Sequence, residues 1–281
     1  MNTMIEKKED RAWVELDFNH LKHNVNELKK AMPEDCDLMA VVKAKAYGHG
    51  AFEVATHLNR LGVKAFAVAT IDEGIELRRY GIHGEILILG FTSPDRAKEL
   101  YKYDLIQTLI CYNYALQLNK QGYAIKTHIK IDTGMHRLGF DNNDVEAIKK
   151  AFTMKQISIC GIYTHLSVSD SLAKEDVCFS QLQIQRFYDL LEGLEKEGIE
   201  IPKTHIQSSY GLLNYPELKC NYVRAGISLY GALDSSTNKT RLQLDLRPVL
   251  SLKSRVVLLR QVKSGDSVGY GRSFIARRDS N

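Results

Sequence analysis

The sequence is short of cysteine, of long apolar runs and of clustered charge, and each shortage excludes a class of protein. Its five cysteines are widely spaced, with no CxxC pair and no histidine at metal-ligand spacing. We therefore expect buried thiols in a reducing compartment, no disulfide framework and no bound metal. No apolar run approaches the roughly 20 residues that span a bilayer, and the polar N-terminus lacks the apolar core of a signal peptide. These features predict a soluble, cytoplasmic protein that makes no membrane contact itself.

The charge balance bears on nucleic-acid binding, and the size bears on the number of domains. The chain has 38 basic and 34 acidic residues, a net charge of +4, and its lysines are scattered among acids. This pattern gives little support to nucleic-acid binding. With 281 residues, of which 44% are hydrophobic, either one large α/β barrel or two ordinary domains can bury enough surface to fold. We find no internal repeat, heptad pattern or low-complexity tract.

Short apolar runs alternate with amphipathic helical patterns over most of the chain. After a leading helix over residues 17–32, eight strand-like runs occur: LMAVVKA, AFAVAT, EILILG, LIQTLI, THIKID, ISICGIYTH, THIQSS and YVRAGISLY. The clearest helical patterns between them are GAFEVATHLNRLG, DEGIELRRYG, SPDRAKELYK, NDVEAIKKAF and FSQLQIQRFYDLLEGLEKEG. Strands without polar alternation belong to a parallel sheet buried on both faces. Eight such β-then-α units predict a (β/α)8 (TIM) barrel of the α/β class in preference to an open doubly wound sheet.

The pattern changes near residue 231. A polar spacer, LDSSTNKT, precedes LRPVLSLKSRVVLLRQVKSGDSVGY, which alternates apolar and polar residues without a helix. We predict a domain boundary at residues 231–238, followed by an antiparallel β-rich segment. About fifty residues of β structure form only a small sheet, so we expect an incomplete domain in a partial chain.

Chemistry in such a barrel sits at the carboxyl ends of the strands, and polar residues follow several of them. Lys43 emerges from the first strand beside a glycine-rich turn, where a desolvated lysine would have a lowered pKa and favour covalent chemistry. The alternative is a lysine that reaches out to solvent. Lys130 and Asp132 end the fifth strand and point the same way, which is as compatible with an ion pair as with catalysis.

The last three strands end in residues suited to acid–base chemistry and anion binding. His165 ends the sixth strand and is a general base, a stacking group or a core residue. Ser208 and Ser209 follow the seventh strand, and Arg224, Ala225 and Gly226 end the eighth. Small hydroxyls and free backbone N–H groups at these two strands form the usual phosphate site of this barrel.

Six motifs occur together in one order. They are AVVKAKAYGHG, IKIDTGMHRLGF, GIYTHLSVSD, HIQSSYGLLNYPEL, NYVRAGISLYG and SVGYGRSF. With this order and spacing, from about Arg11 to the end, the chain resembles the alanine racemase family of fold-type III pyridoxal-phosphate enzymes. DTGMHRLG with QSSYGLLNYPEL looks most like the racemase domain of the membrane-bound serine/alanine racemases of vancomycin resistance.

The resemblance implies a two-base mechanism with pyridoxal 5'-phosphate. Lys43 matches the lysine that holds the cofactor covalently and acts as one base. Tyr270 matches the opposing base, which in this family comes from the partner subunit of a homodimer with shared active sites. Bases on opposite faces of a planar carbanion can invert the α-carbon. A phenol with its usual pKa of about 10 is a poor base at neutral pH, and the family tunes it through His165 and Arg224.

The same resemblance assigns the remaining site residues. Arg224 faces the pyridine nitrogen, where a guanidinium can only donate, so we expect transamination and decarboxylation to be restrained. Arg137 matches a residue that contacts the cofactor's phenolic oxygen and the substrate carboxylate. Lys130 matches a position that is often carbamylated to orient that arginine. The positions that match contacts to the cofactor phosphate are Tyr47, Ser209, Gly226 and Ile227.

Three residues beside the site depart from the family pattern. Lys45 and Ser208 stand where many members have asparagine, and His136 replaces a frequent glycine. These departures bear on substrate preference more than on reaction type. The family's β-domain also continues past residue 281 and supplies part of the partner's substrate pocket.

The sequence therefore predicts an amino-acid racemase, an isomerase that interconverts L and D forms of alanine, serine or both for peptidoglycan, with a role in vancomycin resistance as one setting. One alternative is a pyridoxal-phosphate carrier of the same barrel fold without racemase activity. A decarboxylase is a further alternative, which Arg224 disfavours. We expect residues 1–12 to form a strand that joins the β-domain, 13–234 the cofactor-binding barrel and 235–281 the incomplete β-domain. The chain is either a cytoplasmic protein or the cytosolic domain of a membrane-anchored one.

Overall fold

The computed structural model describes residues 11–233 and 239–281, and the chain divides into two compact units. One unit is Asp17–Val249, and the other combines the chain up to Leu16 with Leu250–Asn281. Most of the strand predicted over residues 1–12 lies outside the described residues. The predicted division into 1–12, 13–234 and 235–281 stays a prediction.

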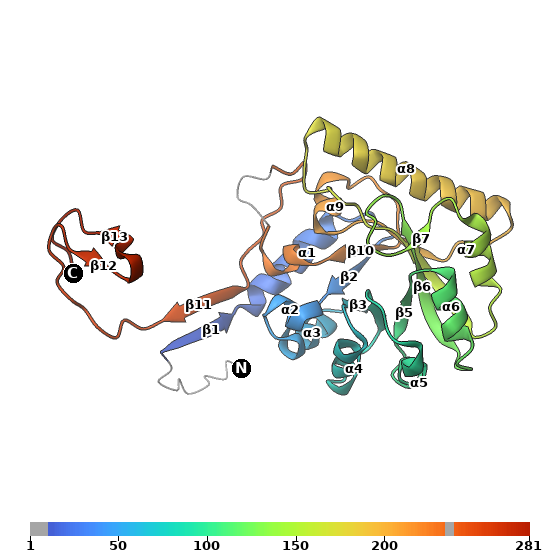
Figure 1. Ribbon diagram of the computed structural model, residues 1–281, viewed down its shortest axis with the longest axis horizontal. Coiled ribbons are helices and arrows are strands. Elements are labelled where there is room, and N and C mark those ends of the chain that lie inside the picture. The colour runs from blue at the N-terminus through green and yellow to red at the C-terminus, as the bar shows by residue number, and fades with distance from the viewer. Residues whose placement is uncertain (1–10, 234–238) are drawn as a thin grey trace. The chain divides into compact units, whose positions relative to one another are not determined.

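The larger unit is built around a nearly closed barrel of parallel strands, as the alternating pattern predicts (Figure 1). The sheet order is β10-β2-β3-β4-β5-β6-β8-β9. Backbone hydrogen bonds from Asn221 N–H to the Thr204 carbonyl (2.8 Å) and from Arg224 N–H to the Gln207 carbonyl (3.1 Å) bring the two ends together. The strands are β2 (Asp37–Val41), β3 (Ala65–Val68), β4 (Glu85–Ile88), β5 (Ile106–Leu109), β6 (Ile125–Asp132), β8 (Ile157–Tyr163), β9 (Lys203–His205) and β10 (Tyr222–Ala225).

Helices alternate with these strands and cover the outside of the sheet (Figure 1). Two of these helices begin at residues whose side chains cap the first turn. The Asp17 side chain accepts hydrogen bonds from the first turn of α1, and Thr70 with Glu73 forms a capping box at α4. The helices are α1 (Phe18–Ala31), α3 (Ala51–Arg60), α4 (Ile71–Arg79), α5 (Ala97–Lys102), α6 (Tyr112–Asn119), α7 (Val145–Phe152) and α8 (Lys174–Lys196).

Side-chain alternation along the strands separates two cores. In β2, Leu38 and Ala40 face the helices and belong to the larger apolar cluster. Met39 and Val41 face the barrel interior and pack in a smaller cluster with residues such as Tyr163. The strands are thus buried on both faces, which explains their continuous apolar runs.

Several short elements at the strand ends were not among the predicted ones. The turns α2 and α9 and the 3-10 helix η2 are too short to show helical periodicity, and α6 is only weakly amphipathic. The 3-10 helix η1 is different, because it lies inside the predicted SPDRAKELYK pattern and leads directly into α5. The bounds of these short elements, with the short strand β7, are α2 (Lys43–Tyr47), η1 (Pro94–Arg96), β7 (Phe140–Asp141), α9 (Ser209–Asn214) and η2 (Ile227–Tyr230).

The smaller unit contains antiparallel pairs, in line with its alternating sequence. Strand β1 (Ala12–Leu16) pairs with β11 (Leu250–Ser254), and β12 (Ser267–Val268) pairs with β13 (Phe274–Ile275). The 3-10 helix η3 (Tyr270–Arg272) lies between the latter two. The apolar run Val256–Leu259 forms no strand and is exposed. Its predicted strand is absent because no described segment supplies the pairing hydrogen bonds.

The five cysteines are free thiols, but the expectation that they are buried is wrong. Cys111 and Cys178 are exposed and the other three are partly buried. Among the described residues, no group of three histidine, cysteine, aspartate or glutamate side chains is placed to hold a metal ion. No helix in the described part of the chain is long and apolar enough to cross a bilayer.

Candidate active site

A cavity of about 380 Å³ lies at the carboxyl ends of the barrel strands. The structure brings all nine predicted residues of the barrel into its lining. They are Lys43, Tyr47, Lys130, Arg137, His165, Ser209, Arg224, Gly226 and Ile227. The tenth predicted residue, Tyr270, belongs to the other unit and is fully exposed, so its role stays a prediction.

A left-handed helical turn follows Lys43. The four residues after it, Ala44 to Tyr47, have φ between 51° and 54°, a conformation that costs non-glycine residues roughly 1–2 kcal/mol each. Glu73 at the start of α4 holds this turn, because its carboxylate accepts from Ala44 N–H and Ala69 N–H, both at 2.7 Å. The turn places Lys43 and Tyr47 on the same cavity, with the Lys43 amine 5.9 Å from the centre of the Tyr47 ring.

Hydroxyl and backbone N–H groups gather where the loops after β9 and β10 meet. Ser209 Oγ accepts from the Ser228 hydroxyl at 2.9 Å and from Gly226 N–H at 3.0 Å. A Cβ on Gly226 would lie 2.7 Å from the Tyr47 hydroxyl, so only glycine lets this phenol approach the loop. The cluster gathers neutral donors of the kind that phosphate binding requires, although the Gly226 N–H and the Ser228 hydroxyl donate to Ser209 Oγ in this structure. The sequence motif did not reveal Ser228, because it lies within an apolar run.

Arg224 lines the cavity and connects several groups around it by hydrogen bonds. It is buried, and it donates to His165 Nδ1 at 2.9 Å, to His205 Nδ1 at 2.8 Å and to the Thr164 carbonyl at 2.9 Å. Burial lowers its pKa to about 10, so the guanidinium remains charged at neutral pH. Because a guanidinium only donates, the Nδ1 atoms of both histidines must accept.

This requirement sets the tautomers of a buried histidine chain. Burial, with the Arg224 charge as the next cause, lowers the pKa of His165 and of His205 well below the usual 6.5, so both rings are neutral at pH 7. Each then carries its proton on Nε2. His205 Nε2 donates to His128 Nδ1 at 2.9 Å. This leaves the His128 proton on Nε2, a buried atom with no hydrogen-bond partner in the described part of the chain. Burial lowers the pKa of His128 to about 4.

Neither His128 nor His205 was predicted as a site residue, because each lies inside an apolar strand pattern. The His128 ring lies directly against Gly161 of β8. A Cβ on this residue would lie 2.5 Å from the ring, so glycine is needed here to make room for the histidine. Tyr163 was also missed. Its ring stacks on His205 at 4.5 Å between centroids, and it lines the cavity. The pairing of the neighbouring strands β6, β8 and β9 brings these three side chains into contact.

The cavity is strongly positive. Lys43, Lys130, Arg137 and Arg224 all line it, and no acidic side chain occurs among its described lining residues. Lys130 is buried, and burial, followed by the charges of Arg137 and Arg224, lowers its pKa to about 8. A field of this sign attracts anionic groups such as phosphate and carboxylate.

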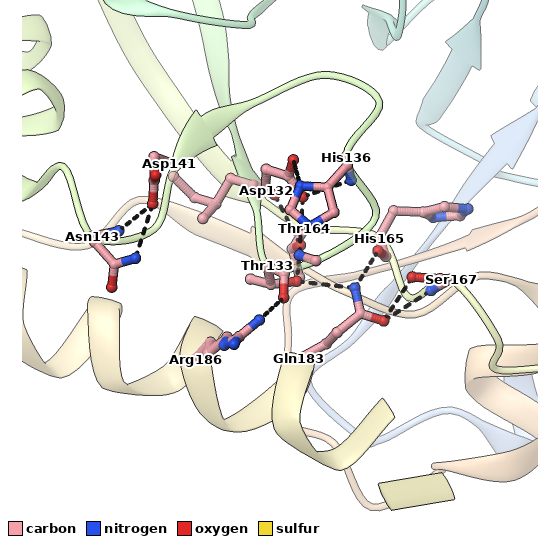
Figure 2. Close-up of polar contacts among 12 residues, drawn as sticks. Asp132, Thr133, His136, Asp141, Asn143, Thr164, His165, Ser167, Gln183 and Arg186 are labelled. Atoms are coloured by element: carbon pink, nitrogen blue, oxygen red, sulfur yellow. Dashed lines mark hydrogen bonds and ion pairs between the residues drawn. The ribbon is translucent and has the colours of Figure 1, made fainter. Parts of the chain in front are cut away.

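The ion pair considered for Lys130 and Asp132 is not present in the described residues. The Asp132 carboxylate instead accepts from Gly134 N–H at 2.9 Å and from His136 N–H at 3.1 Å, and lies 3.4 Å from the His136 ring nitrogen (Figure 2). Asp132 therefore stabilises the loop that leads to Arg137. Lys130 lines the cavity without an ion pair to Asp132.

Comparisons with known proteins agree on one family. The model of the alanine racemase N-terminal domain matches residues 16–234. The chain is 56% identical over 271 residues to an amino-acid racemase from Enterococcus faecalis, which covers 96% of this chain and 38% of that protein. It is 42% identical over 270 residues to a serine/alanine racemase from Enterococcus gallinarum, with 96% and 38% covered. The chain thus spans 38% of the length of these two relatives.

The fold comparison gives the same result. The alanine racemase of Clostridium difficile 630 superposes with a TM-score of 0.87 at 33% sequence identity, and the match covers 97% of this chain and 72% of that one.

Proposed function

The chain belongs to the alanine racemase family, and we propose that it is part of a pyridoxal-phosphate-dependent isomerase that interconverts the L and D forms of alanine, serine or both. The named racemases among its relatives support an amino-acid substrate. The proposal extends to a homodimer with shared active sites that works in the cytoplasm. It also includes a supply of D-residues for peptidoglycan, with vancomycin resistance as one setting, on the motif resemblance given in the sequence analysis.

The residues around the cavity fit pyridoxal phosphate. A volume of about 380 Å³ lies within the range of small-ligand sites. The Ser209 and Tyr47 hydroxyls can donate to a phosphate, and so can the Gly226 N–H once it leaves Ser209 Oγ. Gly226 also leaves room that a Cβ would fill. The Lys43 amine and the Arg224 guanidinium line the same cavity and suit a covalent attachment and a contact to the ring nitrogen. When bound, the cofactor supplies an electron sink that lets an amino-acid α-hydrogen leave as a proton.

The histidine tautomer supports the role proposed for Tyr270. Because His165 accepts from Arg224 at Nδ1, its only proton is on Nε2, and it can donate that proton in a hydrogen bond to a phenolate. Such a bond, with the Arg224 charge behind it, lowers the pKa of a tyrosine. Arg224 and His165 thus prepare a tyrosine base on one face, and Lys43 holds or moves the proton on the other.

Lys130 is suited to carbamylation, which we propose as part of the same site. Reaction with carbon dioxide needs the neutral amine, and a pKa of about 8 leaves a useful neutral fraction at physiological pH. A carbamate would replace one of four positive charges by a negative one beside Arg137. Carbon-13 bicarbonate would give a carbamate signal in the wild-type spectrum that Lys130→Met lacks.

The observation that carries the proposal is the convergence of Lys43, Arg224 and His165 with a phosphate cradle on one cavity. The test is chiral product analysis with L-alanine and L-serine in parallel, after loading with pyridoxal phosphate. We expect racemisation of at least one substrate, and its loss together with the absorbance of the covalent cofactor in Lys43→Ala. Wild-type turnover in Lys43→Ala would overturn the proposal, and cofactor binding without turnover would favour the carrier.

A further inference from the structure

Helix α8 carries a glutamine on the face that packs against the barrel. Gln183 is completely buried, one turn before the buried Phe187 on the same face. Burying a primary amide is costly unless its N–H and C=O groups are paired. The partners of this amide therefore indicate what the residue does.

The Gln183 amide bonds to two segments that lead into the cavity (Figure 2). Its Oε1 accepts from the Ser167 backbone N–H at 2.9 Å and from the Ser167 hydroxyl at 3.0 Å. Its Nε2 donates to the His165 carbonyl and to Thr133 Oγ1, each at 3.3 Å. One side chain thus spans the loop after β8, which carries His165, and the loop after β6, which leads to Arg137.

Two neighbours on the same face of α8 complete the contact with the β6 loop. Arg186 donates to the Thr133 carbonyl at 3.0 Å (Figure 2). A Cβ on Gly134 would lie 3.1 Å from the Phe179 ring and 3.4 Å from an Arg186 nitrogen. Residues 179, 183 and 186 have the spacing of one helix face, so α8 packs directly on this loop.

The two loops are also hydrogen-bonded to each other and to Arg224. The Thr133 and Thr164 hydroxyls lie 2.9 Å apart, and Thr164 Oγ1 donates to the Ile131 carbonyl at 2.9 Å. The Thr164 carbonyl accepts from Arg224. A shift of the His165 backbone would therefore change the geometry at Arg224, the residue that bonds the His165 ring.

We propose that Gln183 is a positioning residue, which holds the His165 backbone so that the imidazole stays hydrogen-bonded to Arg224 inside the cavity. The catalytic meaning of this role rests on the proposed function. The positioning itself does not, because all the contacts are within the barrel.

The surroundings of His165 provide a readout. Its pKa is held well below 6.5 by burial first, and then by Arg224 of β10, Lys130 of β6, Arg137 of the β6 loop and Lys43 after β2. All four are cations, so burial and the four charges lower the pKa of His165 together. Movement of the ring toward solvent would weaken all of these effects. A displaced His165 should titrate closer to its usual range.

The test compares Gln183→Met, which keeps the length of the side chain but cannot hydrogen-bond, with Gln185→Met. Gln185 is an exposed residue of the same helix that bonds only Asp189 among its described contacts. Histidine NMR of the cofactor-free protein, with His165 assigned from His165→Asn, follows each variant from about pH 5 to 8. We expect no His165 titration in this range for wild type and Gln185→Met, and a His165 midpoint that moves up into the range for Gln183→Met.

An unchanged His165 titration in folded Gln183→Met would overturn the proposal. If that variant does not fold, Gln183→Asn keeps a buried amide that is one methylene too short to span both loops, and the same shift decides. Failure of both variants to fold, while Gln185→Met folds, would assign Gln183 to global stability and also reject the proposal.

Activity provides the second measurement. A misplaced acid–base group costs roughly 10- to 100-fold in the chemical step, so we expect kcat for racemisation to fall by about tenfold in Gln183→Met while cofactor affinity is unchanged. If the wild type binds the cofactor but does not racemise alanine or serine, the proposed function fails. The NMR titration then still decides the positioning role by itself.

Discussion

Lys130 places a buried amine among three other cations, and this arrangement must oppose folding at neutral pH. Its pKa falls from 10.5 to about 8, so the folded protein binds this proton less tightly than the unfolded chain. The penalty is fully present below pH 8 and disappears as the pH rises from about 8 to 10.5. The shift corresponds to at most about 3 kcal/mol.

We therefore predict that Lys130→Met raises the free energy of unfolding by about 1–3 kcal/mol at pH 7. Urea denaturation in buffer free of carbon dioxide measures this, and the gain should shrink between pH 8 and 10.5. Lys203→Met is the matched control. Lys203 bonds Glu85 and Tyr222, each at 2.7 Å, so its loss should destabilise the protein. A Lys130→Met variant less stable than wild type at pH 7 would contradict the prediction.

The residues that depart from the family pattern acquire a physical meaning in the structure. Lys45 and His136 have φ of 53° and 52°, in the left-handed region where asparagine and glycine are the most comfortable residues. The sequence comparison marked both positions as unusual. It could not reveal the reason, because the left-handed turn has no periodic signature.

The turn after Lys43 is an element under strain, and one substitution should relieve part of it. Asparagine tolerates the left-handed conformation better than lysine, and Lys45 is exposed. We predict that Lys45→Asn increases the free energy of unfolding by about 0.5 kcal/mol. Urea denaturation of the cofactor-free protein is the measurement. A lower unfolding midpoint would show that Lys45 makes a stabilising contact that outweighs its backbone strain.

Two glycines should respond in opposite ways because they belong to different elements. Gly226→Ala pushes a Cβ against the Tyr47 hydroxyl, and overpacking of this kind costs about 1–3 kcal/mol, so cofactor affinity should fall about tenfold or more. Gly193 lies within α8 with open space around it. Gly193→Ala should add about 0.5–1 kcal/mol of stability and leave affinity unchanged. Fluorescence titration with pyridoxal phosphate and urea denaturation measure the two effects. Equal affinity in Gly226→Ala would remove this loop from the phosphate cradle.

Long elements could be predicted and short ones could not. The eight barrel strands and helices such as α3 and α8 repeat a pattern over enough residues to identify their type and order. The turns α2 and α9, which carry Lys43 and Ser209, are five and six residues long. Their shape depends on neighbours distant in sequence, such as Glu73 at the α2 turn.

For the whole molecule, the barrel site followed from the sequence mainly through recognisable motifs at strand ends. The supporting network did not follow, because His128, His205 and Gln183 lie inside strand and helix patterns as single polar residues. Their partners are separated from them by 77 residues for His128 with His205, and by 18 for Gln183 with His165. Strand pairing in the sheet brings the two histidines together, and the packing of α8 on the barrel brings Gln183 to His165.

The proposed dimer makes a quantitative prediction for mixed subunits. Lys43→Ala and Tyr270→Phe should each be inactive alone, because each removes one of the two bases. If Tyr270 serves the partner's site, a mixed dimer contains one site that lacks both residues and one site that retains both. Random mixing of equal amounts makes half of the dimers mixed, so about one quarter of the wild-type racemase activity should return. Mixing after mild dissociation, followed by chiral product analysis, measures the recovery. If Lys43 and Tyr270 of the same chain formed the site, neither subunit of any mixture would hold an intact pair, and no activity would return.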